Sequence, residues 1–146
     1  MPYGACSLGF PLQSINNIYG AAKIYDTRSG IDPDFPDTLL DDKELSIICN
    51  LGKEFGVTTG RRRKVNWLNI DKLSQALLTT GTTSCIISKT DILEEAQKFK
   101  LFYNNKLVSF NNLNDMKSYI DDILLSKCPH LKNIIYSDDV EKVNGL

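Results

Sequence analysis

The sequence predicts an α/β fold: a partial parallel sheet with flanking helices and a small antiparallel hairpin, in a single domain over residues 1–146. Three observations support this class. Segments with apolar side chains at helical spacing alternate with short apolar runs, as they do where helices pack on a sheet. Two further apolar runs flank a short turn, which predicts a hairpin. Finally, 42% of the residues are hydrophobic and 24% are charged, which is ordinary for a globular chain that buries a core.

The first half of the chain predicts two helices separated by a long loop. Apolar side chains recur at helical spacing between residues 12 and 24, so we expect an amphipathic helix there. Residues 26–42 contain Pro33 and Pro36 among many aspartates, a composition that disfavours regular structure and indicates a loop. Residues 44–51 are expected to form a short helix that ends at Gly52.

The middle of the chain predicts a helix followed by a buried strand. Asn69 is suited to cap a helix over residues 70–78, and Gly81 is suited to end it. The run Ser84–Ser88 is apolar and β-branched, as expected of a strand inside a parallel sheet.

The last third predicts the hairpin, a helix and a final strand. The two hairpin strands are expected over residues 99–103 and 107–110, on either side of an Asn-Asn-Lys turn. Apolar positions over residues 116–124 have helical spacing, and this helix should stop before Pro129. Residues 133–136 should form the last strand.

Residues 56–63 read Gly-Val-Thr-Thr-Gly-Arg-Arg-Arg and are the most informative stretch of the chain. Glycine lets backbone N–H groups approach an anion, threonine hydroxyls add donors, and arginine offers a planar fork suited to carboxylate or phosphate. A chain with a formal net charge of −1 has no general need for three consecutive arginines. The stretch therefore predicts an anion-binding loop. The alternative is a solvated basic turn, but Trp67 and Leu68 anchor the segment directly afterwards.

Lys89, Thr90 and Asp91 follow the expected strand Ser84–Ser88 at its C-terminal end, the edge where open α/β sheets bind ligands. A carboxylate there can accept hydrogen bonds from the N1–H and the exocyclic amine of guanine, and a lysine stem can cover the purine face. Nucleic-acid binding is a weaker interpretation of the basic residues, because 17 basic residues are balanced by 18 acidic ones.

Several other classes of site are not expected. The four cysteines are widely spaced, so reduced thiols in the cytoplasm are expected, buried at Cys49 and Cys85, and structural zinc is not. The single His130, beside Pro129, is expected to be solvated rather than catalytic. No phosphate-loop or dinucleotide motif occurs, and no apolar run reaches the roughly 20 residues of a membrane span.

In four segments the sequence resembles the adenylosuccinate synthetase family, which joins aspartate to C6 of inosine monophosphate (IMP) and hydrolyses GTP. The segments are Cys-Ser-Leu-Gly-Phe-Pro at 6–11, a stretch over 19–30, Gly-Lys-Glu-Phe-Gly-Val-Thr-Thr-Gly-Arg-Arg-Arg at 52–63 followed by Trp-Leu, and Ser-Lys-Thr-Asp-Ile-Leu at 88–93. The resemblance covers residues 6–93 well and the tail loosely. It implies a C-N ligase of purine biosynthesis, with Mg²⁺ accompanying GTP.

The resemblance also implies roles for individual residues. The loop that closes on aspartate would consist of Val57, Thr58, Thr59, Gly60, Arg61, Arg62 and Arg63. Arg61 would also contact the IMP ribose, and Arg63 would bridge aspartate and GTP. The GTP-binding residues would be Arg63, Lys89, Thr90, Asp91 and Ser137.

The departures from the family pattern are as informative as the match. The family's phosphate loop, catalytic aspartate and catalytic histidine belong to its N-terminal half and have no counterpart here. We therefore expect no catalytic residue and no metal ligand in this chain, and activity only with an N-terminal half, in a homodimer when full length. The family's Ser-x-Gly-Pro segment is replaced by Tyr-Ser-Asp-Asp at 136–139, and residues 32–38 are one residue longer than their counterpart.

Three alternative functions remain at this point. The stretch over residues 100–132 is short, as in compact archaeal and viral members, and some phage relatives use a (deoxy)guanylate substrate to make a 2-aminoadenine precursor. A second alternative is a non-catalytic nucleotide-binding or interaction domain. A simple polyanion binder is the third.

Overall fold

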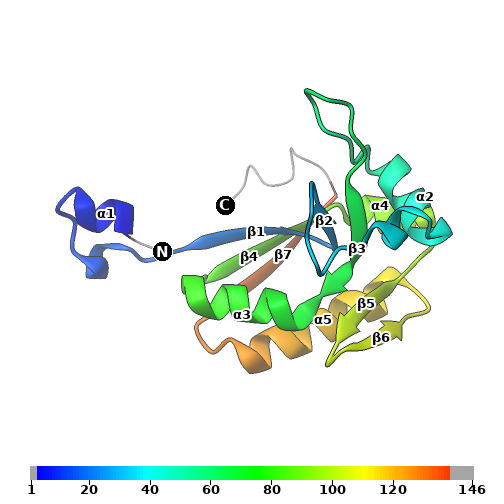
Figure 1. Cartoon of the computed structure of the whole chain (residues 1–146). Coiled ribbons are helices and arrows are strands. Elements are labelled where there is room, and N and C mark those ends of the chain that lie inside the picture. The colour runs from blue at the N-terminus through cyan, green and yellow to red at the C-terminus, as the bar shows by residue number, and fades with distance from the viewer. Residues whose placement is uncertain (1–2, 139–146) are drawn as a thin grey trace.

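The computed structural model describes residues 3–138. Within this range the strands form two sheets flanked by helices, which confirms the α/β class (Figure 1). The elements follow one another as α1 (Tyr3–Ser7), the 3₁₀ turn η1 (Leu12–Ser14), β1 (Tyr19–Lys23), β2 (Tyr25–Arg28), the 3₁₀ turn η2 (Asp37–Leu40), α2 (Lys43–Leu51), β3 (Lys64–Asn69), α3 (Ile70–Thr80), β4 (Ser84–Ser88), α4 (Thr90–Ala96), β5 (Lys100–Tyr103), β6 (Lys106–Ser109), α5 (Leu113–Lys127) and β7 (Asn133–Ser137).

The first sheet is parallel and has the strand order β1-β4-β7. Its register aligns the last residues of the three strands, Lys23, Ser88 and Ser137, in one row. The three strands of this sheet therefore end at the same level, along one C-terminal edge. The expected strands Ser84–Ser88 and 133–136 are both confirmed as its members.

The second sheet is mixed and has the order β2-β3-β5-β6. Its outer pair is the expected hairpin, whose turn residues Asn104 and Asn105 both have positive φ, at 50° and 58°. Asparagine tolerates this left-handed conformation better than most residues, which suits a tight turn. The two sheets share a chain segment, because only Ile24 separates β1 from β2.

The helix ends follow from identifiable capping residues. Asn69 accepts a hydrogen bond from the backbone N–H of Lys72 at the start of α3, as expected. Gly81 ends that helix in the left-handed conformation, with φ of 67°. The expected helices at 44–51 and 116–124 are confirmed as α2 and α5, and α5 ends before Pro129.

The helix expected over residues 12–24 is wrong, because residues 19–23 form strand β1 and only residues 12–14 form a 3₁₀ turn. Pairing with β4 overrides the helical spacing. A Cβ added to Gly20 would lie 2.9 Å from the side chain of Thr82, so close packing requires glycine here. The expected loop 26–42 also begins too early, since β2 extends to Arg28. Strand β3 and helices α1 and α4 were not predicted.

The hydrophobic core lies between the helices and the two sheets, and its largest fully buried side chains include Ile48, Leu68, Leu101 and Ile120. The cysteines are free, with Cys6 exposed and the other three buried, as expected for Cys49 and Cys85. His130 is half-buried, and its ring Nε2 lies 3.1 Å from the carbonyl oxygen of Leu77. Among residues 3–138, no helix is long and apolar enough to cross a membrane.

Candidate functional site

The candidate site is built where the C-terminal edge of the parallel sheet meets the arginine-rich stretch. The stretch leaves α2, projects from the body of the molecule and returns as β3 (Figure 1). Lys89 stands directly after β4 at the same edge, and Ser137 ends β7. The topology therefore brings together two segments, 56–63 and 89–91, that the sequence singled out separately.

Residues 56–63, here called the arginine loop, form a tight turn closed by backbone hydrogen bonds. The N–H of Gly56 donates to the carbonyl of Arg61 at 2.8 Å, and the N–H of Gly60 donates to the carbonyl of Gly56 at 2.8 Å. Gly60 has φ of 62°, a left-handed conformation that explains glycine at this position. The tip is open to solvent, and the side chain of Val57 is 99% exposed.

The three arginines of the loop point to different surroundings. Arg61 is exposed, and within the described part of the chain its guanidinium forms no hydrogen bond or ion pair. Arg62 is half-buried and donates to the carbonyl of Leu40 at the end of η2, at 3.2 Å, and to the hydroxyl of Ser46 on α2, at 2.8 Å. Its Nε also contacts the Cys49 thiol at 3.4 Å. Arg62 therefore fastens the loop to the body, whereas Arg61 faces outward.

Arg63 belongs to a buried cluster that sequence reasoning missed. The carboxylate of Glu54, which is 3% exposed, accepts hydrogen bonds from Lys23 Nζ at 2.6 Å, the Tyr25 hydroxyl at 2.9 Å and an Arg63 terminal nitrogen at 3.2 Å. Two cations thus share one anion, which leaves excess positive charge at the sheet edge. The Nε of Arg63 is the one buried side-chain nitrogen or oxygen among the described residues without a hydrogen-bond partner. The one signal in the sequence was a lone acid just before the arginine loop.

The cluster adjoins the Lys89 segment through Gly52. A Cβ on Gly52 would clash with the Tyr25 hydroxyl, so glycine is required for the backbone to pass the cluster. The carbonyl of Gly52 accepts a hydrogen bond from Lys89 Nζ at 3.5 Å. Asp91 is near enough for its negative charge to contribute to the raised pKa of Tyr25, after burial and the hydrogen bond to Glu54. Lys89 and Asp91 thus lie next to the Glu54 cluster, to which Arg63 of the arginine loop belongs.

Thr90 and Ser137 are held inside this edge rather than on its surface. Thr90 is buried and donates its hydroxyl to the carbonyl of Ser137 at 3.4 Å, which ties β7 to the start of α4. Ser137 is itself 6% exposed. Lys89 has a positive φ of 68°, which turns the chain sharply from β4 into α4 and leaves Asp91 exposed.

Because of the cluster, the free energy of unfolding of the chain should depend on pH through the Glu54 carboxyl. Burial raises the pKa of the Glu54 carboxyl, but hydrogen bonds from Lys23 and Tyr25 and the charges of Lys23 and Arg63 outweigh it, so the pKa lies below its ordinary value of 4.5. The ionised carboxyl therefore stabilises the fold at every pH above that value, and the stabilisation is lost as pH falls through the lowered pKa.

We expect wild type to be more stable than Glu54→Gln near neutral pH, with the advantage shrinking as the pH is lowered to about 3. Urea unfolding of both proteins at each pH measures the difference, and titration of the other carboxylates cancels between them. An advantage that stays constant across this range would contradict the assigned ionisation.

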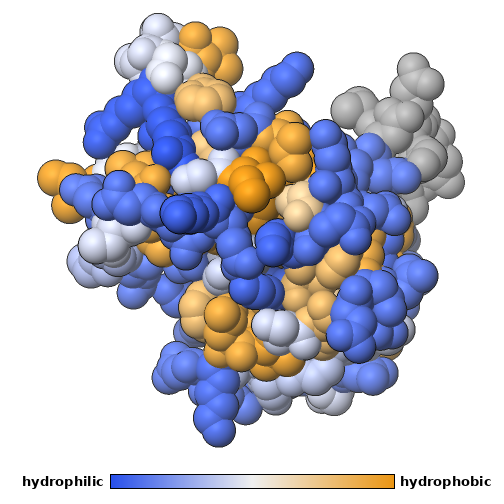
Figure 2. Space-filling view, turned by 90° about the vertical axis from the view of Figure 1, so that its right-hand side faces the viewer, coloured by the Kyte–Doolittle hydropathy of each residue, from blue (hydrophilic) through white to orange (hydrophobic). Residues whose placement is uncertain are grey.

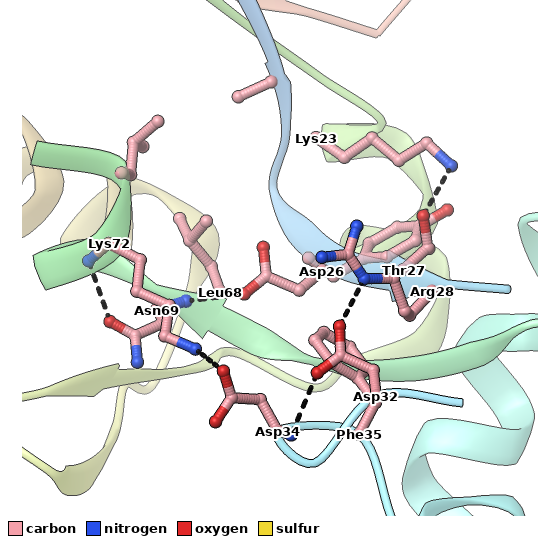
Figure 3. Close-up of a pocket in the computed structure, with 13 residues that line it drawn as sticks. Lys23, Asp26, Thr27, Arg28, Asp32, Asp34, Phe35, Leu68, Asn69 and Lys72 are labelled. Carbon is pink, nitrogen blue, oxygen red and sulfur yellow. Dashed lines mark hydrogen bonds and ion pairs between the residues drawn. The ribbon is translucent and has the colours of Figure 1, made fainter. Parts of the chain in front are cut away.

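A cavity of about 390 Å³, also missed from the sequence, lies beside the cluster (Figure 3). Lys23 and Tyr25 line both features. Its far wall carries two ion pairs, Arg28 with Asp32 at 2.5 Å and Lys72 with Asp34 at 2.6 Å. Burial raises the pKa of the Asp26 carboxyl, which accepts a hydrogen bond from the N–H of Asn69. The cavity therefore has a mixed lining, in which two ion pairs lie among apolar side chains such as Leu68 and Leu73.

The described residues do not form a metal site of their own, since no three His, Cys, Asp or Glu side chains among residues 3–138 converge as ligands would. The face of the molecule on the side of α2 and α4 is mixed, with apolar patches between hydrophilic ones (Figure 2). Ile47 on α2 and Phe55 shortly after it are large exposed apolar residues.

Comparison with known proteins identifies the family. A sequence model of adenylosuccinate synthetase matches residues 2–127. The chain is 41% identical over 101 residues to the adenylosuccinate synthetase of Petrotoga mobilis, covering 69% of this chain and 24% of that protein. It is 37% identical over 117 residues to that of Lodderomyces elongisporus, covering 80% of this chain and 26% of the relative.

A solved structure shares the fold. The fully ligated adenylosuccinate synthetase from Plasmodium falciparum aligns with a TM-score of 0.63 at 18% identity, covering 92% of this chain and 40% of that one. The chain spans about a quarter of the length of the curated relatives it matches, at 24% and 26% for the two above. The matched segment includes the arginine loop and Lys89–Asp91 but ends before Ser137. The chain therefore belongs to the adenylosuccinate synthetase family.

Proposed function

We propose that this chain supplies the aspartate-binding loop and the guanine-binding residues of a GTP-dependent ligase that joins L-aspartate to IMP and forms adenylosuccinate. The observation that carries the proposal is the convergence of the arginine loop and the Lys89 segment on the Glu54 cluster, joined by the contact of Lys89 with Gly52. Residues 37 positions apart along the chain meet at the sheet edge where α/β folds bind ligands.

The arginine loop would bind the aspartate substrate. The exposed Arg61 offers a guanidinium fork suited to a carboxylate and, in the proposal, to the IMP ribose. Thr58, Thr59 and the backbone around Gly60 add donors at the open tip, while Arg62 keeps the loop fastened to α2. A loop that is fixed at its base and open at its tip can close around a substrate.

Arg63 would face the nucleotide. Glu54 holds its guanidinium through one terminal nitrogen, and the side chain is 34% exposed, so its other donors can reach an incoming anion. In the proposed ligase reaction a phosphoryl group moves from GTP to the 6-oxygen of IMP. The aspartate amine then attacks C6 and displaces that oxygen as inorganic phosphate. The excess positive charge of the cluster would stabilise the negative charge on the transferring group.

Lys89, Thr90 and Asp91 would recognise guanine, with the Asp91 carboxylate accepting from the base edge and the Lys89 stem covering its face. Ser137 would contribute a further contact from the end of β7. Magnesium would accompany GTP, but the proposal assigns it no ligand in this chain and no step that depends on it. The complete enzyme is proposed to be a cytoplasmic homodimer.

Reconstitution tests the proposal. The chain is combined with the part of the Petrotoga mobilis synthetase that it does not match, and GTP consumption is followed with IMP and aspartate added singly and together. We expect turnover only when both are present, and none from either part alone. Turnover with deoxyguanylate instead of IMP would assign the phage-type substrate. A complex that binds GTP but never turns over would favour a non-catalytic nucleotide-binding module.

A further inference from the structure

Lys23 is the cation of the Glu54 cluster that has no part in the ligand contacts proposed above. It ends β1 in the same row as Ser88 and Ser137, at the sheet edge where α/β folds bind ligands. Its ammonium donates to the Glu54 carboxylate at 2.6 Å and to the Thr27 hydroxyl at 3.5 Å (Figure 3). An ammonium has three N–H donors, so one donor of Lys23 is without a hydrogen-bond partner among residues 3–138.

The position of the Lys23 ammonium is fixed by its neighbours. Besides its bond to Glu54, the ammonium lies 5.7 Å from the centroid of the Tyr25 ring, close enough for a cation–π contact. Tyr25 is only 1% exposed and donates its own hydroxyl to Glu54, so the ring is held as well. A donor that is already held in place loses little conformational entropy when a ligand binds, which favours affinity.

The shared carboxylate is buried, whereas both cations reach the surface. The side chain of Glu54 is 3% exposed, that of Lys23 is 29% exposed and that of Arg63 is 34% exposed. An anion that arrives from solvent therefore meets the two cations before their common counter-ion. Arg63 uses one terminal nitrogen for Glu54, at 3.2 Å, and its other terminal nitrogen has no hydrogen-bond partner within the described residues. Each cation thus keeps a donor for an incoming group.

We propose that Lys23 binds a phosphoryl group together with Arg63, and that Glu54 is the residue that positions these two cations, here called the cation pair. The location favours a phosphoryl group, an inference that rests on the proposed function. Through Gly52 the cation pair adjoins Lys89, which would bind guanine, and through Arg63 it joins the loop that would bind aspartate. The phosphates of GTP would lie between the base and the co-substrate. Lysine binds phosphate as a point charge, and arginine binds it with a planar fork.

The test uses the full chain without any other protein, because Lys23, Glu54 and Arg63 all belong to it. Calorimetric titration with pyrophosphate and with succinate measures the affinity for a phosphoryl anion and for a dicarboxylate. We expect pyrophosphate to bind more tightly than succinate. NMR signals of the Lys23 ammonium and the Arg63 guanidinium should both shift when pyrophosphate is added. This measurement on wild type tests the contact even where a variant fails to fold.

Three variants separate a direct contact from an effect of charge. Lys23→Gln should weaken pyrophosphate binding roughly 10- to 150-fold, as expected for the loss of a hydrogen bond to a charged group. The double variant Lys23→Gln/Glu54→Gln loses one cation and one anion, so the cluster keeps its net charge. It should bind as weakly as Lys23→Gln, because the ammonium is still missing. Lys98→Gln is the matched control, since Lys98 is 36% exposed and is paired with Glu44, and it should leave binding unchanged.

Four results would overturn the role of Lys23. The first two are the absence of pyrophosphate binding by the folded wild type and tighter binding of succinate. The third is recovery of wild-type affinity in the double variant, because Lys23 would then act only by neutralising Glu54. The fourth is an equal loss of affinity in Lys98→Gln, which would reduce the effect to the net charge of the chain. Circular dichroism verifies that each variant is folded.

GTP consumption by the reconstituted enzyme separates this inference from the ligase function. Pyrophosphate binding that depends on Lys23, without turnover by the reconstituted wild type, would support the cation pair and reject the ligase. Turnover by Lys23→Gln at the wild-type rate and with wild-type GTP saturation would reject the cation pair and leave the ligase function standing.

Discussion

Replacing Arg61 by alanine is expected to raise the aspartate concentration needed for half-maximal turnover of the reconstituted enzyme while leaving the stability of the chain unchanged. Hydrogen bonds to charged groups contribute about 1.5–3 kcal/mol, which corresponds to roughly 10- to 150-fold in affinity. Arg61 is exposed and its guanidinium has no hydrogen bond or ion pair among residues 3–138, so its removal costs the fold little. The measurement is aspartate saturation of GTP consumption.

Arg62 offers the reverse control within the same loop. Arg62→Ala removes the contacts with Leu40 and Ser46 and leaves their oxygens without these donors, so the free energy of unfolding should fall by about 1–3 kcal/mol. Urea denaturation of both variants separates the two roles. Normal aspartate saturation in Arg61→Ala would remove the proposed substrate contact, and unchanged stability in Arg62→Ala would remove the proposed anchor.

Replacing Asp91 by asparagine is expected to exchange guanine for xanthine recognition. A carboxylate accepts both the N1–H and the exocyclic amine of guanine, whereas an amide presents one acceptor and one donor. Xanthine has a carbonyl in place of that amine and matches the amide. GTP binding should weaken roughly 10- to 150-fold, and xanthosine triphosphate should bind better to the variant than to wild type.

Calorimetry with the two nucleotides measures this exchange on the reconstituted complex. Asp91 is exposed, so the substitution should not alter folding. If the affinity for both nucleotides fell to the same extent, Asp91 would act through structure or charge and not by hydrogen bonding to the base edge. Unchanged GTP affinity would place guanine elsewhere.

Local chemistry predicted those elements whose ends carry their own signals. The cap at Asn69, the left-handed end at Gly81 and the Asn-Asn turn are decided within a few residues, so the sequence indicated them. The sequence does not indicate strand β1, because Tyr-Gly-Ala-Ala-Lys lacks strand alternation. The conformation of β1 depends on pairing with β4, in which Tyr19 pairs with Ser84, 65 residues later in the chain. Strand β3 begins at Lys64, a buried lysine paired with Asp37, which no local rule suggests.

The residues of the candidate site likewise fall into those that local sequence indicates and those that only the fold brings together. The arginine loop and Lys89–Asp91 were visible because their residue types are concentrated over a few positions. Glu54, Lys23 and Tyr25 were not, because they form a unit only after β1, β2 and the segment that follows α2 are brought together. The division of the arginines into an anchor, a cluster member and an outward group likewise depends on the fold, since the three residues are chemically identical in sequence.

The single residue between β1 and β2 sets the spacing of the proposed ligand groups. Ile24 is fully buried, and on either side of it the chain belongs to a different sheet. Lys89 is carried by the neighbour of β1, whereas the arginine loop leads into the neighbour of β2. The distance between Lys89 and the arginine loop is therefore set by covalent backbone rather than by adjustable side-chain packing. Ile24 thus fixes the distance between the proposed guanine-binding residues and the arginine loop.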